Sequence, residues 1–161
     1  MTDTSDVVIR DAEPEEVDAI ADLALRLKRL NGEFDPMFQV REDAEEQLRE
    51  YLSQAIHDPE RIVLVAVVGR KVVGMVKADL VDRLFYVPKI KGEIVEFYVL
   101  PEFRRKGLGE ELMEQTFKRL NKEGADIIAA EFPALNQIAV TFYKKQGFQE
   151  LVYIYAKTLG K

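Results

Sequence analysis

One feature of the sequence constrains the possible folds of this chain most: a strand that ends at a proline and leads into a basic, glycine-containing turn. Residues 94–100 (IVEFYVL) are mostly apolar and aromatic, and Pro101 ends the strand because proline cannot donate a hydrogen bond to a neighbouring strand. Residues 104–109 then read RRKGLG, and apolar side chains recur at helical spacing from Leu112 to Leu120. Three cations and two glycines therefore stand at a helix N-terminus, where free N–H groups and the helix dipole favour a phosphate group.

Two common phosphate-binding motifs do not match this turn. The Walker motif requires a Lys-Ser or Lys-Thr pair, and the dinucleotide-binding fingerprint requires a small residue where Leu112 stands. The segment VLPEFRRKGLG (99–109) instead resembles the acyl-CoA site of the GNAT superfamily of N-acetyltransferases, whose signature [QR]-x-x-G-x-[GA] follows the fourth strand. Arg104, Gly107 and Gly109 occupy the defined positions of that signature.

A second segment strengthens the resemblance. Residues 136–148 (NQIAVTFYKKQGF) match the superfamily pattern N-x-x-A-x-x-[FL]-Y-x-K-x-G-F, in the usual order and at the usual separation from the first motif. The matching positions are Asn136, Ala139, Phe142, Tyr143, Lys145, Gly147 and Phe148. The sequence is thereby identified as a member of the superfamily.

The resemblance implies acetyl-CoA as the cosubstrate, with its pantetheine arm along the end of the fourth strand and its pyrophosphate on the basic turn. The cofactor-binding positions that it implies are Tyr98, Val99, Leu100, Arg104, Arg105, Lys106, Gly107, Leu108, Gly109, Asn136 and Tyr143. It also implies a catalytic role for Tyr143, whose hydroxyl would protonate the leaving thiolate of CoA. Two of these residues have simpler explanations, since Asn136 can serve as a helix N-cap and Tyr143 as a core aromatic.

Transfer to an amine needs a base, because an amine of the lysine type has a pKa of about 10.4 and attacks only in its neutral form. The resemblance implies direct transfer in a ternary complex, with a carboxylate on the fourth strand, or a water chain leading to it, as the base. Glu93, eleven positions before Arg104, is the first candidate and Glu96 is the second. Strand alternation places these two carboxylates on opposite faces, so only one can face the acceptor. Some branches of the superfamily carry the acid where this chain has Val95.

The remaining elements agree with the topology of the superfamily. We expect strands at 7–10, 62–68, 72–80, 94–100, 126–132 and 148–158, and helices at 14–31, at 44–56, after Gly107 and from Asn136 to Gly147. The apolar centre of 126–132 (DIIAAEF) indicates a strand buried on both faces. This order predicts one α/β domain over residues 1–161 with the GNAT fold, a mixed and mostly antiparallel sheet with helices on both faces.

The composition excludes several kinds of site. The 161 residues include no cysteine and one histidine, His57, so disulfides and cysteine-based metal sites cannot form, and we expect no metal. The longest apolar run, 62–68, is too short to span a bilayer, and residues 1–6 are polar and acidic, unlike a signal peptide. We therefore expect a cytoplasmic protein that does not bind membranes.

The charges are unevenly distributed along the chain. Residues 1–60 hold 17 acidic and 6 basic side chains, whereas residues 61–161 hold 12 acidic and 17 basic ones. A basic second half suits polyanionic CoA, and an acidic first half attracts a cationic acceptor and repels nucleic acid. In the loop at 33–41, Phe34, Met37 and Phe38 either line the acceptor site or pack beneath the loop. The acidic side chains also have a simpler explanation, the solubility of amphipathic surface helices.

Two functions are compatible with these observations. The leading one is an acetyl-CoA-dependent N-acetyltransferase that acetylates a primary amine of a small molecule, a polyamine-like compound, a peptide or a protein. The alternative is a catalytically silent domain that binds acyl-CoA as a sensor or interaction module. The joint presence of the intact turn, a candidate base and Tyr143 favours the enzyme. The sequence also allows a homodimer.

Overall fold

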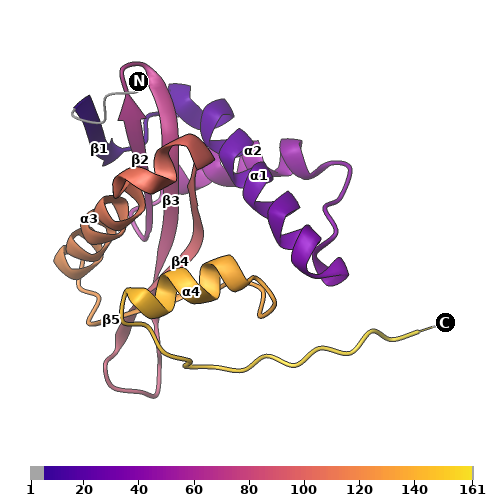
Figure 1. Cartoon of the computed structure of the whole chain (residues 1–161). Helices are drawn as coiled ribbons and strands as arrows, with labels where there is room; N and C mark the ends of the chain where they lie inside the picture. The colour runs from indigo at the N-terminus through magenta and orange to yellow at the C-terminus, as the bar shows by residue number, and fades with distance from the viewer. Residues whose placement is uncertain (1–5, 161) are drawn as a thin grey trace.

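One five-stranded sheet organises the part of the chain that the structure describes. The computed structural model describes residues 6–160, without the side chains of Arg105 and Lys106. The strands follow sequence order: β1 (Val7–Asp11), β2 (Arg61–Val68), β3 (Lys71–Asp82), β4 (Ile90–Val99) and β5 (Ile127–Ala130). Neighbouring strands run antiparallel except β4 and β5, which are parallel. The predicted mixed, mostly antiparallel sheet is confirmed (Figure 1).

Helices cover both faces of this sheet. They are α1 (Val17–Phe34), α2 (Ala44–Ile56), α3 (Leu108–Lys122) and α4 (Gln137–Lys145), with short 3-10 turns at Pro14–Glu16, Pro36–Phe38 and Pro101–Lys106. Lys77 on β3 donates a hydrogen bond to Tyr51 of α2. Gly92 on β4 lies against Leu120 of α3 and pairs with Leu80 on β3. Since Lys77 and Leu80 point to opposite faces, α2 and α3 lie on the two sides of the sheet (Figure 1).

The core consists of the apolar residues that the periodic patterns predicted. Strands β2 and β3 bury runs of branched aliphatic side chains because helices cover both of their faces. The amphipathic helices contribute one apolar face each, with Ile20 and Leu23 of α1 and Leu112 and Leu120 of α3 almost inaccessible to solvent. Within residues 6–160, no helix is long and apolar enough to cross a membrane.

The first helix is longer than predicted. We expected it to end at 31, but α1 continues to Phe34, and the carboxylate of Asp35 then accepts a hydrogen bond from the N–H of Met37 (3.0 Å). A side chain at Gly32 would meet the carbonyl oxygen of Phe38 at 2.9 Å, so this glycine makes room for the following loop and does not end the helix. Met37 and Phe38 are 60% and 44% exposed, so they do not pack beneath that loop.

Two predictions for the C-terminal third of the chain are wrong. Of the predicted strand 126–132, only Ile127–Ala130 lies in the sheet, and these residues are half-buried because β5 is the edge strand. The predicted final strand 148–158 does not form, because no strand within residues 6–160 pairs with it, and residues 149–160 are exposed. Phe148 alone packs on the body, against Phe117 and Tyr143.

Candidate functional site

Strands β4 and β5 separate beyond a short paired region. Their pairing ends at Ile94 and Ala130, and the last backbone hydrogen bond runs from the N–H of Glu131 to the carbonyl of Ile94 (3.1 Å). Pro133 then removes a donor, and the chain turns away into α4. On this side, the backbone of residues 95–99 has no strand partner among the described residues. Apart from the carbonyl of Val99, which accepts a hydrogen bond from Arg104, the polar groups that point to this side are available to a ligand.

A β-bulge in β4 determines which face of the sheet each of the two candidate bases points to. Neighbouring positions 77 and 78 of β3 pair with positions 96 and 94 of β4, so Val95 is an extra residue. Lys77 lies opposite Glu96, and Asp79 lies opposite Glu93. Lys77 and Asp79 are two positions apart and share a face of the sheet, so the two glutamates share it as well. The prediction that Glu93 and Glu96 point to opposite faces is therefore wrong.

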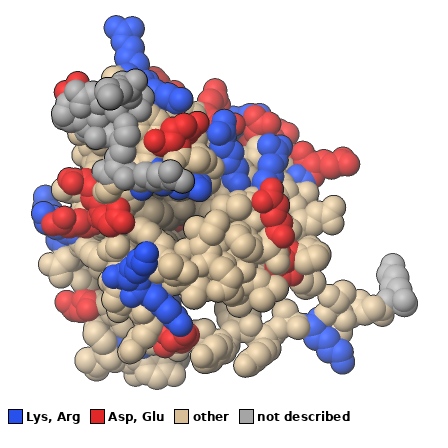
Figure 2. Space-filling view, in the orientation of Figure 1, with Lys and Arg blue, Asp and Glu red and all other residues tan. Residues whose placement is uncertain are grey.

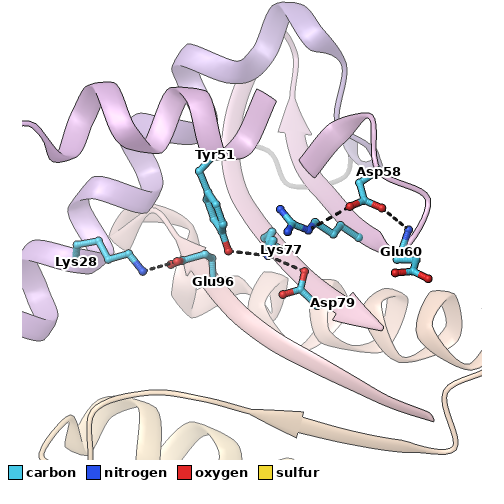
Figure 3. Close-up of polar contacts among 8 residues, drawn as sticks. Lys28, Tyr51, Asp58, Glu60, Lys77, Asp79 and Glu96 are labelled. Atoms are coloured by element: carbon cyan, nitrogen blue, oxygen red, sulfur yellow. Dashed lines mark hydrogen bonds and ion pairs between the residues drawn. The ribbon is translucent and has the colours of Figure 1, made fainter. Parts of the chain in front are cut away.

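Glu96 is a buried carboxylate next to the point where the strands separate. It is 4% exposed, and Lys28 of α1 donates a hydrogen bond to its Oε1 (Figure 3). The other oxygen, Oε2, is buried without a hydrogen-bond partner among the described residues. Burial raises the pKa of Glu96, against the opposing effect of the positive charges on Lys28 and Lys77. A carboxylate with a raised pKa and a free oxygen is suited to accept a proton.

A buried lysine lies beside Glu96 on the same face. Lys77 is 1% exposed, and its Nζ lies 2.6 Å from the hydroxyl oxygen of Tyr51 and 2.6 Å from Oδ1 of Asp79 (Figure 3). The contact with Asp79 is an ion pair that lacks hydrogen-bond geometry. These partners compensate the charge for its lost hydration. Tyr51, Lys77 and Asp79 were not predicted from the sequence, and Lys28 was given no role in the site; the available signal was a lysine inside the apolar strand 72–80.

Glu93 belongs to a second pair of carboxylates. Its side chain is 23% exposed, and its Oε2 lies 3.7 Å from Nζ of Lys91. A hydrogen bond with Glu93 raises the pKa of Glu131, and burial and repulsion between the two charges add to this effect. Glu131 therefore holds a proton more readily than an isolated carboxylate does. Glu131 was not predicted from the sequence, because its partner Glu93 lies on a neighbouring strand.

Tyr143 of α4 lies in an aromatic cluster. Its ring stacks on that of Phe132, with centroids 5.0 Å apart, and its side chain is 8% exposed. Tyr143 is therefore part of the core, as the simpler explanation from the sequence predicted. Burial, with a smaller contribution from the negative charge of Glu96, raises the pKa of Tyr143 far above that of an exposed tyrosine. The hydroxyl therefore keeps its proton, as a donor to a thiolate must. Tyr143 and Glu96 lie close enough for the charge of one to affect the other.

The basic turn positions a helix N-terminus, as predicted. Gly107 takes a left-handed conformation (φ 75°) between the turn Pro101–Lys106 and the first residue of α3, Leu108. A Cβ at Gly107 would meet no atom within 4 Å, so there is open space beside the free N–H groups of the first turn of α3. Gly109 faces α4, where a Cβ would lie 3.6 Å from the ring of Phe142.

The cations of the turn differ in what they contact. Nε of Arg104 donates a hydrogen bond to the carbonyl of Val99 (2.7 Å), and its guanidinium lies 4.9 Å from the ring centre of Tyr98. Arg104 therefore holds the end of β4 in place. The side chains of the other two predicted cations, Arg105 and Lys106, lie outside the described part of the structure. The predicted pantetheine positions have buried side chains, so only their backbone can contact a ligand: Tyr98, Val99 and Leu100.

Asn136 connects two helices at the mouth of the opening. Its Oδ1 accepts a hydrogen bond from the N–H of Ala139 (3.1 Å), which confirms the predicted N-cap of α4. Its Nδ2 donates to Oδ1 of Asn31 on α1 (3.0 Å), and both side chains are buried. This contact joins the C-terminal half of α1 to the start of α4, across the opening between β4 and β5.

The acidic residues near the first loop are partly neutralised. Besides the hydrogen bond of Asp35, Asp43 pairs with Arg41 (3.0 Å) and Glu45 pairs with Arg49 (3.1 Å), all near the surface. Ion pairs at exposed positions contribute little free energy, so these acids can exchange partners.

The fold and the site define an α/β protein whose sheet opens beside a glycine-containing turn and a helix N-terminus. The family model described as Acetyltransferase (GNAT) family matches residues 25–148, and the chain belongs to this family. The resemblance seen in the sequence is thereby confirmed.

Individual relatives support this assignment. An N-alpha-acetyltransferase of Sulfurisphaera tokodaii is 30% identical over 112 residues, which cover 66% of this chain and 62% of the relative. The matches span less than two thirds of the length of the curated relatives.

Solved structures share the fold. A predicted acetyltransferase of Clostridium acetobutylicum with acetyl-CoA has a TM-score of 0.77 at 15% identity, over 94% of this chain and 96% of that one. The aminoglycoside antibiotic 6'-N-acetyltransferase AAC(6')-IG of Acinetobacter haemolyticus has a TM-score of 0.74 at 20% identity, over 95% and 99%. At these identities the structural matches establish the fold alone.

Proposed function

We propose that this chain is an acetyl-CoA-dependent N-acetyltransferase that transfers the acetyl group directly to a primary amine. The observation that carries the proposal is the arrangement around the opening between β4 and β5. The turn with Gly107 follows the end of β4, and the buried pair Glu96 and Tyr143 lies near the point where the strands separate. A site for an anionic cofactor and a candidate base and acid thus adjoin one strand.

The residues present fit acetyl-CoA as the acetyl donor. The N-terminus of α3 and the space beside Gly107 would receive the pyrophosphate. The backbone groups of residues 95–99 that face away from β3, other than the carbonyl held by Arg104, would pair with the amides of the pantetheine arm. Bound in this way, the thioester supplies an activated acetyl group. The Clostridium acetobutylicum structure with acetyl-CoA supports the choice of cofactor.

Two side chains of this protein, Glu96 and Tyr143, would transfer the protons of the reaction. Oε2 of Glu96 accepts a proton from the acceptor ammonium, which frees the nitrogen lone pair to form the new C–N bond. As the C–S bond breaks, the hydroxyl of Tyr143 donates its proton to the sulfur, and the second proton that the nitrogen loses as the amide forms returns to the Tyr143 oxygen. Glu96 then releases the first proton to solvent. The raised pKa values of both groups suit these roles, since Glu96 becomes a stronger base and Tyr143 stays protonated.

Two observations favour Glu96 over Glu93 as the base. Glu96 has a buried oxygen without a partner, whereas Glu93 is more exposed and is engaged by Lys91 and Glu131. The negative charge of Glu96 also raises the pKa of Tyr143, so the two side chains are close enough to act on one reacting centre. Glu93, which shares the face of Glu96 and forms a hydrogen bond with Glu131, would pass the proton on to solvent.

The acceptor is a cation in this proposal. The terminal α-amine acetylated by an N-alpha-acetyltransferase and the amines of an aminoglycoside are largely ammonium groups at neutral pH. The acidic side chains of the first loop, with Glu33 and Asp35, and the start of α2, with Glu42, Asp43, Glu45 and Glu46, would attract such a group. The exposed Met37 and Phe38 would contact its carbon skeleton.

The acceptor class predicts a dependence on charge and salt. Putrescine and γ-aminobutyrate have carbon chains of the same length, and their far ends carry opposite charges. We expect putrescine to be acetylated with the higher kcat/KM, and this value to fall about threefold or more between about 0.05 and 0.5 M salt because salt screens the attraction. The rate of thiol release from acetyl-CoA gives the kcat/KM for each amine and its dependence on salt. A preference for γ-aminobutyrate, or a kcat/KM for putrescine that salt does not change, would contradict a cationic acceptor.

A silent acyl-CoA-binding module is the second candidate. The ion pair of Glu96 with Lys28 favours it, because a base that is held by a lysine is less available to a substrate. The same assay separates the two functions. Release of thiol that depends on an added amine supports the enzyme, whereas tight CoA binding without release for any amine of a broad panel supports the module.

A further inference from the structure

Two lysines and two carboxylates form a cluster between the sheet and the helices α1 and α2 (Figure 3). Lys28 of α1 donates a hydrogen bond to Oε1 of Glu96 on β4, and Nζ of Lys77 on β3 lies 2.6 Å from Oδ1 of Asp79. Each ammonium group therefore has one carboxylate as its ion-pair partner. With both pairs ionised, these four side chains carry no net charge.

The two lysines differ in their access to water. Lys77 is 1% exposed, and its Nζ donates a hydrogen bond to the hydroxyl of Tyr51 and lies 4.6 Å from the centre of that ring. Lys77 is therefore fixed, because its departure would break three contacts of a buried charge. The side chain of Lys28 is 38% exposed, and its flexible stem can carry the ammonium group into water. Of these two cations, Lys28 is the one that can be exchanged.

Lys28 lies beside the opening between β4 and β5. On α1 it precedes by one turn Asn31, whose side chain makes the contact to α4 across this opening. A hydrogen bond with Glu93 raises the pKa of Glu131, and the positive charge of Lys28 is one of the effects that oppose this rise. The ammonium group of Lys28 is thus within electrostatic reach of a second carboxylate. Figure 2 shows acidic and basic side chains intermixed on the surface over α1 and α2, so a released ammonium group stays near negative charges.

In the proposed reaction, the acceptor brings a third ammonium group to this cluster. A further positive charge in a largely buried and neutral cluster is unfavourable unless one of the cations leaves. We propose that the acceptor ammonium displaces Lys28 and replaces it as the counter-ion of Glu96, while Lys77 stays in place. Lys28 is then an internal competitor of the acceptor. This inference rests on the proposed function, because it takes Glu96 as the group that meets the acceptor.

The exchange gives the ion pair between Lys28 and Glu96 a role in selecting the acceptor. Oε2 of Glu96 is buried, so a ligand reaches this carboxylate when a neighbouring side chain withdraws. An ammonium group compensates the charge of Glu96 after Lys28 has left. A hydroxyl or an amide cannot do so, and with such ligands Lys28 keeps its contact. The site thereby favours ligands that arrive as cations.

The affinity for putrescine in the presence of saturating CoA tests the exchange, since CoA carries no acetyl group and no transfer occurs. Methionine at position 28 keeps an unbranched stem and removes the competing charge, so we expect Lys28→Met to lower the Kd about fivefold or more. Arginine binds a carboxylate through two parallel hydrogen bonds and is harder to displace, so Lys28→Arg should raise the Kd about fivefold or more. Isothermal titration calorimetry measures each Kd in the pH range where it no longer changes. This range matters because burial raises the pKa of Glu96, and Lys28→Met removes a charge that opposes the rise.

Two controls separate displacement from other effects. Arg29→Met removes a positive charge from the next, exposed residue of α1 and should change the Kd less than about twofold. Butane-1,4-diol has the carbon chain of putrescine without its charges and should bind no better to Lys28→Met than to the wild type. A similar gain for the diol would mean that the substitution only opens space, and this would overturn the proposal.

The arginine variant decides between displacement and simple repulsion. Equal Kd values for putrescine in Lys28→Arg and the wild type would overturn the exchange, because a charge that only repels does not distinguish the two residues. Lys28→Arg keeps a cation beside Glu96, so this comparison holds even where Lys28→Met does not fold. An unchanged or higher Kd in folded Lys28→Met, or no binding of putrescine to any of the proteins, would also overturn it. None of these measurements involves acetyl transfer, so thiol release tests the proposed function separately.

Discussion

Replacing Glu96 by glutamine is expected to lower kcat by about 100-fold or more, the usual contribution of a general base. Glutamine keeps the size of the side chain but cannot take a proton. The fold should survive, because Lys28, which loses its partner, is 38% exposed and can be hydrated. Steady-state thiol release with a primary amine measures the effect, with circular dichroism to verify folding.

The pH dependence identifies the role of Glu96. A carboxyl group acts as a base only when it is deprotonated, so the wild-type rate should fall as the pH drops through the pKa of Glu96. Burial places this pKa above the ordinary value of 4.5. The Glu96→Gln variant should lose this dependence and recover activity as the pH rises, because more acceptor is then already neutral.

Glu93→Gln is the matched control for this prediction. It removes the other carboxylate from the same face of β4, and we expect a loss of less than about tenfold, as for a residue that only passes the proton on. Full activity in Glu96→Gln together with an inactive Glu93→Gln would assign the role of base to Glu93. Full activity in both variants would leave water or the backbone as the proton path.

Local patterns were sufficient to predict most of the fold. The β-branched runs at 62–68 and 72–80 form β2 and β3, and the basic turn precedes a helix at Leu108, because each depends on residues close in sequence. The N-cap at Asn136 is also local, since the capped N–H belongs to Ala139.

The face of Glu96 could not be predicted, because it depends on a bulge. Alternation assumes one residue per step, and Val95 adds a residue to β4. Where a bulge forms is decided by the register with β3, which the sequence of β4 alone does not contain. The prediction therefore placed Glu96 on the opposite face from Glu93, whereas the two side chains share one face of the sheet.

The buried polar cluster depends on long-range pairing in the same way. Lys28 and Glu96 are 68 positions apart, and Tyr51 and Lys77 are 26 apart. Each residue has an ordinary local explanation, such as a cation near the end of a helix. Only the packing of α1 and α2 on one face of the sheet brings these side chains together.

The predicted final strand, 148–158, does not form, and the reason is again a long-range one. Strand propensity measures how well side chains suit a pleated, half-buried surface, and it does not supply a partner strand. Residues 149–160 have the propensity, but none of the described strands pairs with them.

Replacing Gly107 by glutamate is expected to weaken CoA binding by about 100-fold or more. The new carboxylate would stand beside the N-terminus of α3, where the pyrophosphate is proposed to bind, and close like charges repel by several kcal/mol in a partly desolvated site. Isothermal titration calorimetry with CoA measures the affinity, and thermal unfolding measures the stability of each variant.

Gly107→Gln separates the effect of charge from that of conformation. Both side chains have the same size and meet the same strain at φ 75°, where a residue other than glycine costs about 1–2 kcal/mol. The two variants should therefore lose similar stability, while the glutamine variant keeps a CoA affinity about tenfold or more above that of the glutamate variant, since it adds no negative charge. Equal affinities in the two variants would mean that no anionic group of CoA lies near position 107. An unchanged affinity in folded Gly107→Glu would place the cofactor elsewhere, because a pyrophosphate on the first turn of α3 cannot tolerate a carboxylate at its edge.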